Sequence, residues 1–290
     1  MALNRRAALG LGLAAALPAQ ALAQAQPVVV AAFTILGDFV AQVAPGVVPR
    51  VLLGPEADPH EVSARPSDAA ALRQAALVVR NGLGLEPWLD RLLRAAPPRG
   101  RVLTASEGWP PLTLNGVADP HAWLDPRAAQ HYAGRIGAAL AQVLPAQAAG
   151  IQAATAGYLA RLAALESWAA EQFAAVPAER RVFVTGHPGF GYFAARFGLQ
   201  VLATPPQAWG GQAAGHLAAL VQQVRARQLR ALFSTGAEDA ALMARVAAEA
   251  GVPLRGRLFA ETLSRPDGPA STYEALLRHN TSLLAAAMLA

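Results

Sequence analysis

A single long helical pattern in the middle of the chain constrains the fold more than any other feature. From Ala146 to Val176 the sequence contains no proline, and apolar side chains recur at spacings of three, four and seven residues. These positions are Ile151, Ala154, Tyr158, Leu162, Leu165, Trp168 and Gln172 or Phe173. The spacing predicts one apolar stripe along about eight turns of α-helix. Such a helix is either a rigid strut between two units or a core helix of one larger domain.

The regions on both sides of this helix alternate short β-branched runs with helical patterns. Before it, strands are expected at 28–30, 47–53, 76–80 and 101–105, and helices at 38–44, 66–76, 86–96 and 126–144. After it, strands are expected at 180–186, 199–204, 229–235 and 252–260, and helices at 189–198, 213–228, 239–251 and 271–289. This alternation predicts an α/β fold with two lobes, each built on a mainly parallel sheet.

The first 23 residues have the pattern of a secretory signal peptide. Arg5 and Arg6 precede an apolar run from Ala7 to Leu17, and the segment ends in the A-x-A cleavage pattern at 21–23. An uncleaved membrane anchor is the alternative, although the run is short for a span. No later stretch reaches about 18 apolar residues. We therefore expect a mature chain that is soluble after export.

Charge and cysteine content limit which binding partners and which cellular compartment are expected for this chain. The net charge is +5, and removal of two arginines with the first 23 residues lowers it to about +3. Basic residues do not cluster with aromatic ones, so nucleic-acid binding is not expected. The chain has no cysteine, and therefore neither a disulfide nor a thiol for lipidation. An exported protein without an anchor indicates the periplasm, and we expect a monomer.

These patterns divide the chain into four segments. They are a signal peptide at 1–23, an N-terminal α/β lobe at 24–145, a linking helix at 146–176 and a C-terminal α/β lobe at 177–290. Ligands of open α/β sheets bind outside the carboxyl ends of the strands. We therefore expect the ligand-binding site in the cleft between the lobes.

Four ligand-type side chains come directly after expected strands or apolar runs. The tetrapeptide Ala-Asp-Pro-His occurs twice and ends at His60 and His121, in a chain with only six histidines. His187 and Glu261 each come after a strand of the second half. Three imidazoles and one carboxylate suit Zn²⁺ in a tetrahedral site, whereas Mn²⁺ and Fe²⁺ prefer more oxygen. Taken singly, His60 and His121 are explained more simply as solvated loop side chains, and the repeated tetrapeptide is what favours them as ligands. Taken singly, His187 is a helix-entry residue and Glu261 is one loop carboxylate among several.

The neighbours of these residues carry a weaker signal. Asp58 and Asp119, the second residue of each tetrapeptide, are expected to cap the turn or to accept a hydrogen bond from the imidazole. The proline before each histidine fixes one backbone torsion. The other histidines, His131, His216 and His279, lie at helical positions with polar neighbours. We expect these three on the surface.

The motifs, taken in order, resemble a known family. "FTILGDFVAQV", "VLLGPEADPHEVSARPSDAAALRQAALVVRNGLGLEPWLDRLL", "ADPHAWLDP", "VFVTGHPGFGYFAARFGL" and "FAETLS" with the later "STYEALLRHN" are similar to the metal-binding solute-binding proteins of zinc/manganese ABC importers. The resemblance covers essentially the whole mature chain. It implies two lobes joined by one long rigid helix, a divalent metal ion held between them, no enzymatic activity, and an ABC permease of the inner membrane as partner. Carried over by motif, the metal ligands are His60, His121, His187 and Glu261.

Two departures from the family bear on the metal. The fourth position is more often Asp in the family, and here it is Glu261. No histidine lies between His60 and His121, whereas many periplasmic zinc importers carry a His-rich loop there, which leaves manganese or iron open. Family members that handle manganese often have Glu at the third position, so His187 favours zinc. Zn²⁺ is therefore the expected cargo, with Mn²⁺ or iron as the alternative.

Two other classes of function are compatible with parts of the pattern. An exported zinc hydrolase would use a three-histidine zinc with one open position, although the sequence lacks H-E-x-x-H. A metal-free binder or adhesin would use the same scaffold without an ion. Because zinc binds neutral imidazoles, we expect the affinity of the metal site to fall as the pH drops through about 6.5.

Overall fold

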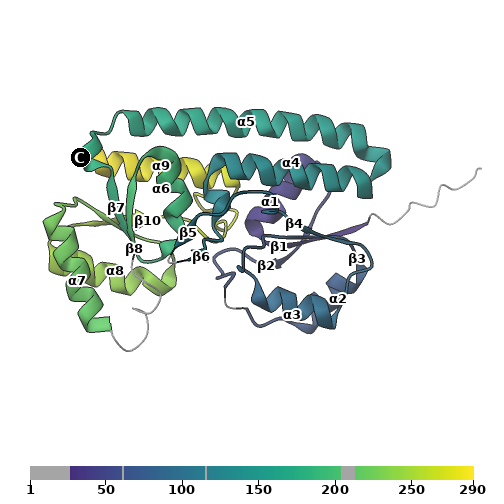
Figure 1. The fold of residues 1–290 in the computed structure, drawn as a ribbon, viewed down its shortest axis with the longest axis horizontal. Helices are drawn as coiled ribbons and strands as arrows, with labels where there is room; N and C mark the ends of the chain where they lie inside the picture. Colours follow the sequence, from purple (N-terminus) through teal and green to yellow (C-terminus); the bar gives the residue numbers. More distant parts are fainter. Residues whose placement is uncertain (1–26, 61, 115, 204–212) are drawn as a thin grey trace, which may run out of the picture.

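The computed structural model describes residues 27–60, 62–114, 116–203 and 213–290. Two four-stranded parallel sheets lie in separate lobes, and helix α5 (Ala148–Ala174) runs along both of them at the top of Figure 1. The predicted α/β fold with two mainly parallel sheets and one long helix is confirmed. The signal peptide predicted at 1–23 lies outside the described residues, and the domain boundaries drawn from sequence stay a prediction.

The first sheet has the strand order β2-β1-β3-β4, with all neighbours parallel. Its strands are β1 (Val28–Phe33), β2 (Arg50–Leu53), β3 (Ala75–Arg80) and β4 (Arg101–Thr104). Its helices are α1 (Thr34–Val43), α2 (Pro66–Gln74), α3 (Pro87–Ala95) and α4 (Pro126–Val143). Helix α1 begins four residues earlier than predicted because Ile35, Leu36 and Phe39 form one buried face with Val40 and Val43.

The second sheet has the order β10-β9-β7-β8 and is also parallel. Its strands are β7 (Val182–Thr185), β8 (Gln200–Ala203), β9 (Leu232–Ser234) and β10 (Leu254–Arg257). Its helices are α6 (Gly191–Phe197), α7 (Ala213–Ala226), α8 (Ala237–Ala250) and α9 (Tyr273–Leu289). Strand β10 is shorter than predicted, because the Asn280 side chain binds both the N–H and the carbonyl of Phe259 and takes that residue out of the sheet.

Helix α5 packs on α4 and α1 on one side of the molecule and on α9 and α6 on the other. Its buried residues are Ile151, Tyr158, Leu162, Leu165, Ala169 and Phe173. The predicted stripe is therefore correct except at Ala154 and Trp168, which are half-buried. One apolar cluster continues from the first sheet under α5 to α9 and α6, and a smaller cluster lies beneath α7 and α8. The long helix thus shares its buried face with both halves of the chain.

A short hairpin lies between the two lobes in Figure 1 and leads into the second Ala-Asp-Pro-His segment. It consists of β5 (Thr113–Leu114) and β6 (Val117–Ala118). The short 3₁₀ helices are η1 (Ala122–Leu124), η2 (Pro145–Gln147), η3 (Ala178–Arg180) and η4 (Pro188–Phe190). Within the described ranges, no helix combines the length and the apolar character needed to cross a bilayer.

Candidate metal centre

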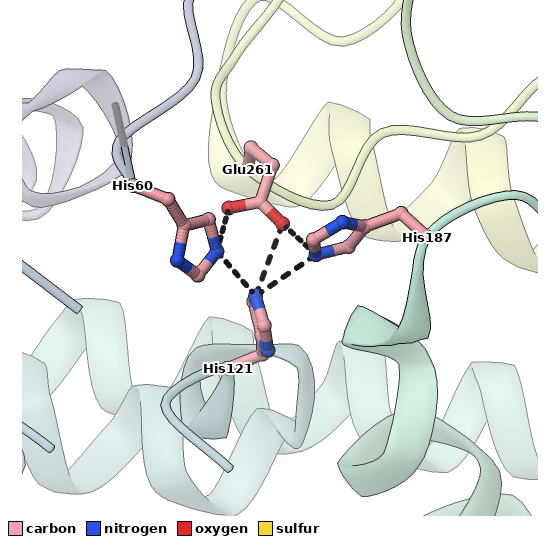
Figure 2. Close-up of side chains that lie close together, drawn as sticks. All are labelled: His60, His121, His187 and Glu261. Atoms are coloured by element: carbon pink, nitrogen blue, oxygen red, sulfur yellow. Dashed lines mark hydrogen bonds and ion pairs between the residues drawn. The ribbon is translucent and has the colours of Figure 1, made fainter. Parts of the chain in front are cut away.

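The four residues singled out in the sequence converge on one point between the lobes (Figure 2). His60 comes after β2, His187 after β7 and Glu261 after β10, so three of them lie beyond the carboxyl ends of parallel strands. His121 instead comes after the β5–β6 hairpin and immediately precedes η1. One ligand atom from each residue lies within 4.8 Å of those from the other three.

The Nε2 atom of His121 lies within 3.3 Å of a ligand atom from each of the other three residues. It is 3.3 Å from Nε2 of His60, 3.2 Å from Nε2 of His187 and 3.0 Å from Oε1 of Glu261. Glu261 Oε1 also lies 2.7 Å from His187 Nε2, and its Oε2 lies 3.6 Å from His60 Nε2. In a tetrahedral zinc site with bonds of about 2.0–2.1 Å, neighbouring ligand atoms lie about 3.3–3.4 Å apart. The spacing of these donors fits a single ion of that size.

The buried carboxylate of Glu261 supports the same conclusion. Both of its oxygens are buried, and they lie 2.7–3.6 Å from the Nε2 atoms of the three imidazoles. Burial would raise the pKa of this carboxyl, but the neighbouring His121 and His187 hold it well below its ordinary value. An anion that is buried in this way needs a cation close by. The donor set fits a divalent metal ion.

The two imidazoles of the repeated tetrapeptide differ in protonation. Burial lowers the pKa of His60, which is therefore neutral near pH 7. Burial would also lower the pKa of His121, but the charge of Glu261 and hydrogen bonds to Asp119 and Glu261 raise it to about 10. A metal ion that binds His121 must therefore displace a proton.

The two aspartates of the tetrapeptide also differ. Asp58 Oδ1 accepts the backbone N–H of His60 at 2.7 Å and caps the turn. Asp119 Oδ1 accepts the backbone N–H of His121 at 3.0 Å and also lies 2.7 Å from its ring Nδ1. With Nδ1 bound to a carboxylate, the Nε2 lone pair of His121 is available to a metal ion. Of the two roles expected from sequence, Asp119 has both and Asp58 has the cap.

Glycine at 189 makes room for two of the imidazoles. A Cβ atom added there would lie 3.0 Å from Cδ2 of His187 and 3.2 Å from Cδ2 of His121. Both distances are closer than ordinary contacts between side chains. The glycines around His187 were visible in the sequence, but their purpose depends on the position of His121.

The remaining histidines lie outside the cluster where they are described. His131 and His279 are half-buried and bind the backbone carbonyls of Glu107 and Arg257 at 2.9 and 2.8 Å. The surface position predicted for these two is therefore met in part: each side chain keeps some exposure, and each ring also lies within hydrogen-bond distance of a backbone carbonyl. The side chain of His216 lies outside the described part of the chain.

The turn between β3 and α3 contains a buried acid that the sequence did not reveal. Glu86, expected as a helix-start charge, is fully buried and accepts the backbone N–H groups of Asn81 at 2.7 Å and Gly82 at 3.0 Å. Burial raises the pKa of Glu86 to about 7, although these two hydrogen bonds lower it in part. The Gly-Leu-Gly run at 82–84 could have indicated an unusual turn next to Glu86. All three residues have positive φ, a conformation that glycine adopts readily.

Comparison with known proteins gives a consistent result. The family model described as "ZnuA: Zinc-uptake complex component A periplasmic" matches residues 29–287. The zinc-binding protein TroA of Treponema pallidum is 29% identical over 282 residues, which cover 92% of this chain and 91% of that protein. The iron-binding protein YfeA of Yersinia pestis is 28% identical, with 89% and 85% covered. The manganese-binding lipoprotein MntA of Halalkalibacterium halodurans is 29% identical, with 87% and 85% covered.

Solved structures show the same fold. The periplasmic zinc-binding protein TroA from Treponema pallidum has a TM-score of 0.82 at 27% identity, covering 91% of this chain and 99% of that one. The manganese-bound periplasmic metal-binding protein from Candidatus Liberibacter asiaticus has a TM-score of 0.81 at 25% identity, covering 90% and 99%. The chain therefore belongs to the ZnuA family, whose members are the periplasmic metal-binding components of ABC importers and not enzymes.

Proposed function

We propose that this protein captures Zn²⁺ in the periplasm through His60, His121, His187 and Glu261 and delivers it to an ABC permease of the inner membrane. The observation that carries the proposal is the convergence of three imidazole nitrogens and one buried carboxylate at tetrahedral spacing. The named relatives include zinc-, iron- and manganese-binding proteins. The choice of metal therefore rests on the donor set of this chain.

Zinc is favoured by the ratio of nitrogen to oxygen. The cluster offers three imidazoles and a single carboxylate among the described residues. Zn²⁺ accepts four donors of this type, whereas Mn²⁺ prefers a larger number of oxygen ligands. Both oxygens of Glu261 face the imidazoles, one toward His121 and His187 and the other toward His60. Manganese or iron, the alternative cargo, would bind through both oxygens of Glu261. The second oxygen would then be a fifth ligand atom.

The same proposal includes the processing and organisation of the chain. Residues 1–23 are removed as a signal peptide, residues 24–145 and 177–290 form the two lobes, and residues 146–176 form the linking helix. Because the chain has no cysteine, it is not anchored through a lipidated thiol as a lipoprotein would be. The mature protein acts as a monomer that moves freely to its permease.

The direct test is metal competition on the mature chain. Zinc and manganese are titrated against a chromophoric chelator, and the metal content of protein purified from its own periplasm is measured by elemental analysis. We expect one zinc ion per chain, with manganese bound more weakly. A chain that arrives loaded with manganese or iron and prefers it in competition would contradict the choice of zinc.

A thermal melt separates this proposal from a metal-free binder on the same scaffold. A ligand present at about 100 times its Kd stabilises a folded protein by about 2.7 kcal/mol. Zinc is therefore expected to raise the melting temperature of the wild type and to leave that of His121→Ala unchanged. Absence of any shift in the wild type would favour a protein that does not bind metal.

A further inference from the structure

The backbone carbonyl immediately before three of the four cluster residues is bound by a buried side-chain N–H group. These carbonyls belong to Pro59, Pro120 and Ala260, which precede His60, His121 and Glu261. The donors are Trp88, Asn81 and Trp123, with exposed fractions of 3%, 0% and 0%. The same arrangement recurs on three loops that are far apart in sequence, so it is a feature of the site.

The two donors of the N-terminal lobe come from one turn, between β3 and α3. Trp88 Nε1 donates to Pro59 at 2.9 Å, and Asn81 Nδ2 donates to Pro120 at 3.0 Å. Asn81 is itself fixed, because its Oδ1 accepts the hydroxyl of Tyr132 at 2.8 Å and its N–H is bound by Glu86. One rigid turn therefore holds the backbone of both Ala-Asp-Pro-His segments.

The third donor connects the two halves of the chain. Trp123 Nε1 donates to the carbonyl of Ala260 at 2.8 Å, across 137 residues of sequence. The backbone carbonyl of Trp123 in turn accepts the hydroxyl of Tyr273 at 2.7 Å. Trp123 lies two residues after His121, so the segment that carries His121 also fixes the loop that carries Glu261.

A hydrogen bond to this carbonyl orients the next residue, which is the metal ligand. The peptide group is planar and contains both the carbonyl oxygen of one residue and the nitrogen and Cα of the next. Fixing the oxygen therefore fixes the position of the next Cα and the direction of its N–Cα bond, from which the ligand side chain starts. At Pro59 and Pro120 the ring already fixes φ, and the hydrogen bond restricts ψ. Each of these prolines is thus held at both of its backbone torsions.

We propose that Trp88, Asn81 and Trp123 are positioning residues for metal capture, which hold the peptide planes before His60, His121 and Glu261 in place before the ion arrives. The proposal rests on the metal-binding function proposed above. A purely structural role would predict a less stable protein with unchanged affinity, whereas positioning predicts weaker binding and altered coordination in a protein that still folds.

The test uses one matched substitution at three tryptophans. Trp88→Phe and Trp123→Phe delete the N–H donor and keep an aromatic ring, and Trp168→Phe is the control because Trp168 lies on α5 with its ring against Arg278. We expect the first two variants to bind zinc about tenfold more weakly, as for loss of a buried hydrogen bond. The visible absorption spectrum of bound Co²⁺ is expected to change in these two variants and to stay as in the wild type in Trp168→Phe.

The outcomes separate this inference from the proposed function. If the wild type does not bind zinc, or if His121→Ala binds it as tightly as the wild type does, the proposed function fails. If those two tests succeed but the Trp88 and Trp123 variants match Trp168→Phe in zinc affinity and cobalt spectrum, the positioning role alone is overturned.

A second measurement needs no variant and applies if the substituted proteins do not fold. Hydrogen exchange of the indole N–H groups is measured by NMR in the wild type with and without zinc. Opening either hydrogen bond moves a ligand loop, so a bound ion should slow exchange at Trp88 and Trp123 by about tenfold or more and leave Trp168 unaffected. Equal exchange rates with and without zinc would overturn the positioning role.

Discussion

The two copies of Ala-Asp-Pro-His have the same letters and different surroundings. The side chain of His60 is 32% exposed, and its Nε2 lies 3.3 Å from His121 Nε2 and 3.6 Å from Glu261 Oε2. The side chain of His121 is 5% exposed, and its Nε2 lies 3.0–3.3 Å from the other three residues. Asp119 contacts the His121 ring, whereas Asp58 caps the backbone of His60. One tetrapeptide thus provides a buried ligand and the other a more exposed one.

The difference comes from the segment on the C-terminal side of each copy. The second copy continues directly into η1 and α4, with the Trp123 ring 5.3 Å from the His121 ring and buried beneath it. After the first copy, residues 62–65 have no regular secondary structure and lead to α2. A motif of four residues fixes local backbone geometry, but the elements on either side determine its burial and charge.

The largest expected effect separates the two histidines themselves. His121→Ala is expected to abolish tight zinc binding, because this buried imidazole lies within 3.3 Å of a ligand atom from each of the other three residues. The loss should exceed the roughly 10–100-fold cost of removing an outer partner of a ligand, and it should be greater than the loss in His60→Ala, because the His60 side chain is more exposed. Chelator competition measures both. A larger loss in His60→Ala would contradict this ranking.

Next in size is the contrast between the two aspartates. Asp119→Asn keeps an acceptor for the backbone N–H but removes the charge beside the His121 ring, and we expect zinc affinity to fall by about 10–100-fold. Asp58→Asn is the matched control, because Asp58 caps only the backbone in the described contacts, and its affinity should stay near that of the wild type. Equal losses in both variants would mean that Asp119 acts as a turn cap alone.

A smaller effect is expected from crowding the two inner imidazoles. Gly189→Ala places a methyl group against His187 and His121, and an overpacked site of this kind costs about 1–3 kcal/mol, or roughly tenfold in affinity at the lower end. Gly150→Ala is the control, since a Cβ there meets nothing within 4 Å. Zinc titration of both variants measures the difference, and unchanged affinity in Gly189→Ala would show that the loop relaxes freely.

A further comparison of the two histidines is the change of affinity with pH near neutrality. Below its pKa of about 10, His121 holds a proton that zinc must displace, so affinity should rise as pH increases. The slope is about tenfold per pH unit for one displaced proton. The rise in zinc affinity should continue above pH 7, whereas the sequence alone indicated a change centred near pH 6.5. Competition titrations at pH 6, 7 and 8 measure this slope. The same slope in His60→Ala would identify His121 as its source, and a plateau above pH 7 would contradict it.

Much of the architecture was visible in local patterns of the sequence. The alternation of strands and helices predicted both parallel sheets, and the spacing from Ile151 to Phe173 predicted the buried face of α5. These predictions succeed because residues three, four or two positions apart share a face of a helix or strand. The end of β10 was predicted wrongly, because it depends on Asn280, which lies 21 residues away from Phe259.

The sequence by itself determined the order of the elements, the long helix and, through its motifs, the four residues that converge. Only the tertiary structure decided that His121 is the more buried of the two histidines, that Asp119 and Asp58 act differently, and that Trp123 holds the loop of Glu261. Periodicity and motifs record neighbours along the chain. The burial, charge and hydrogen bonding of a site depend also on contacts between distant segments, which are 137 residues apart for Trp123 and Ala260.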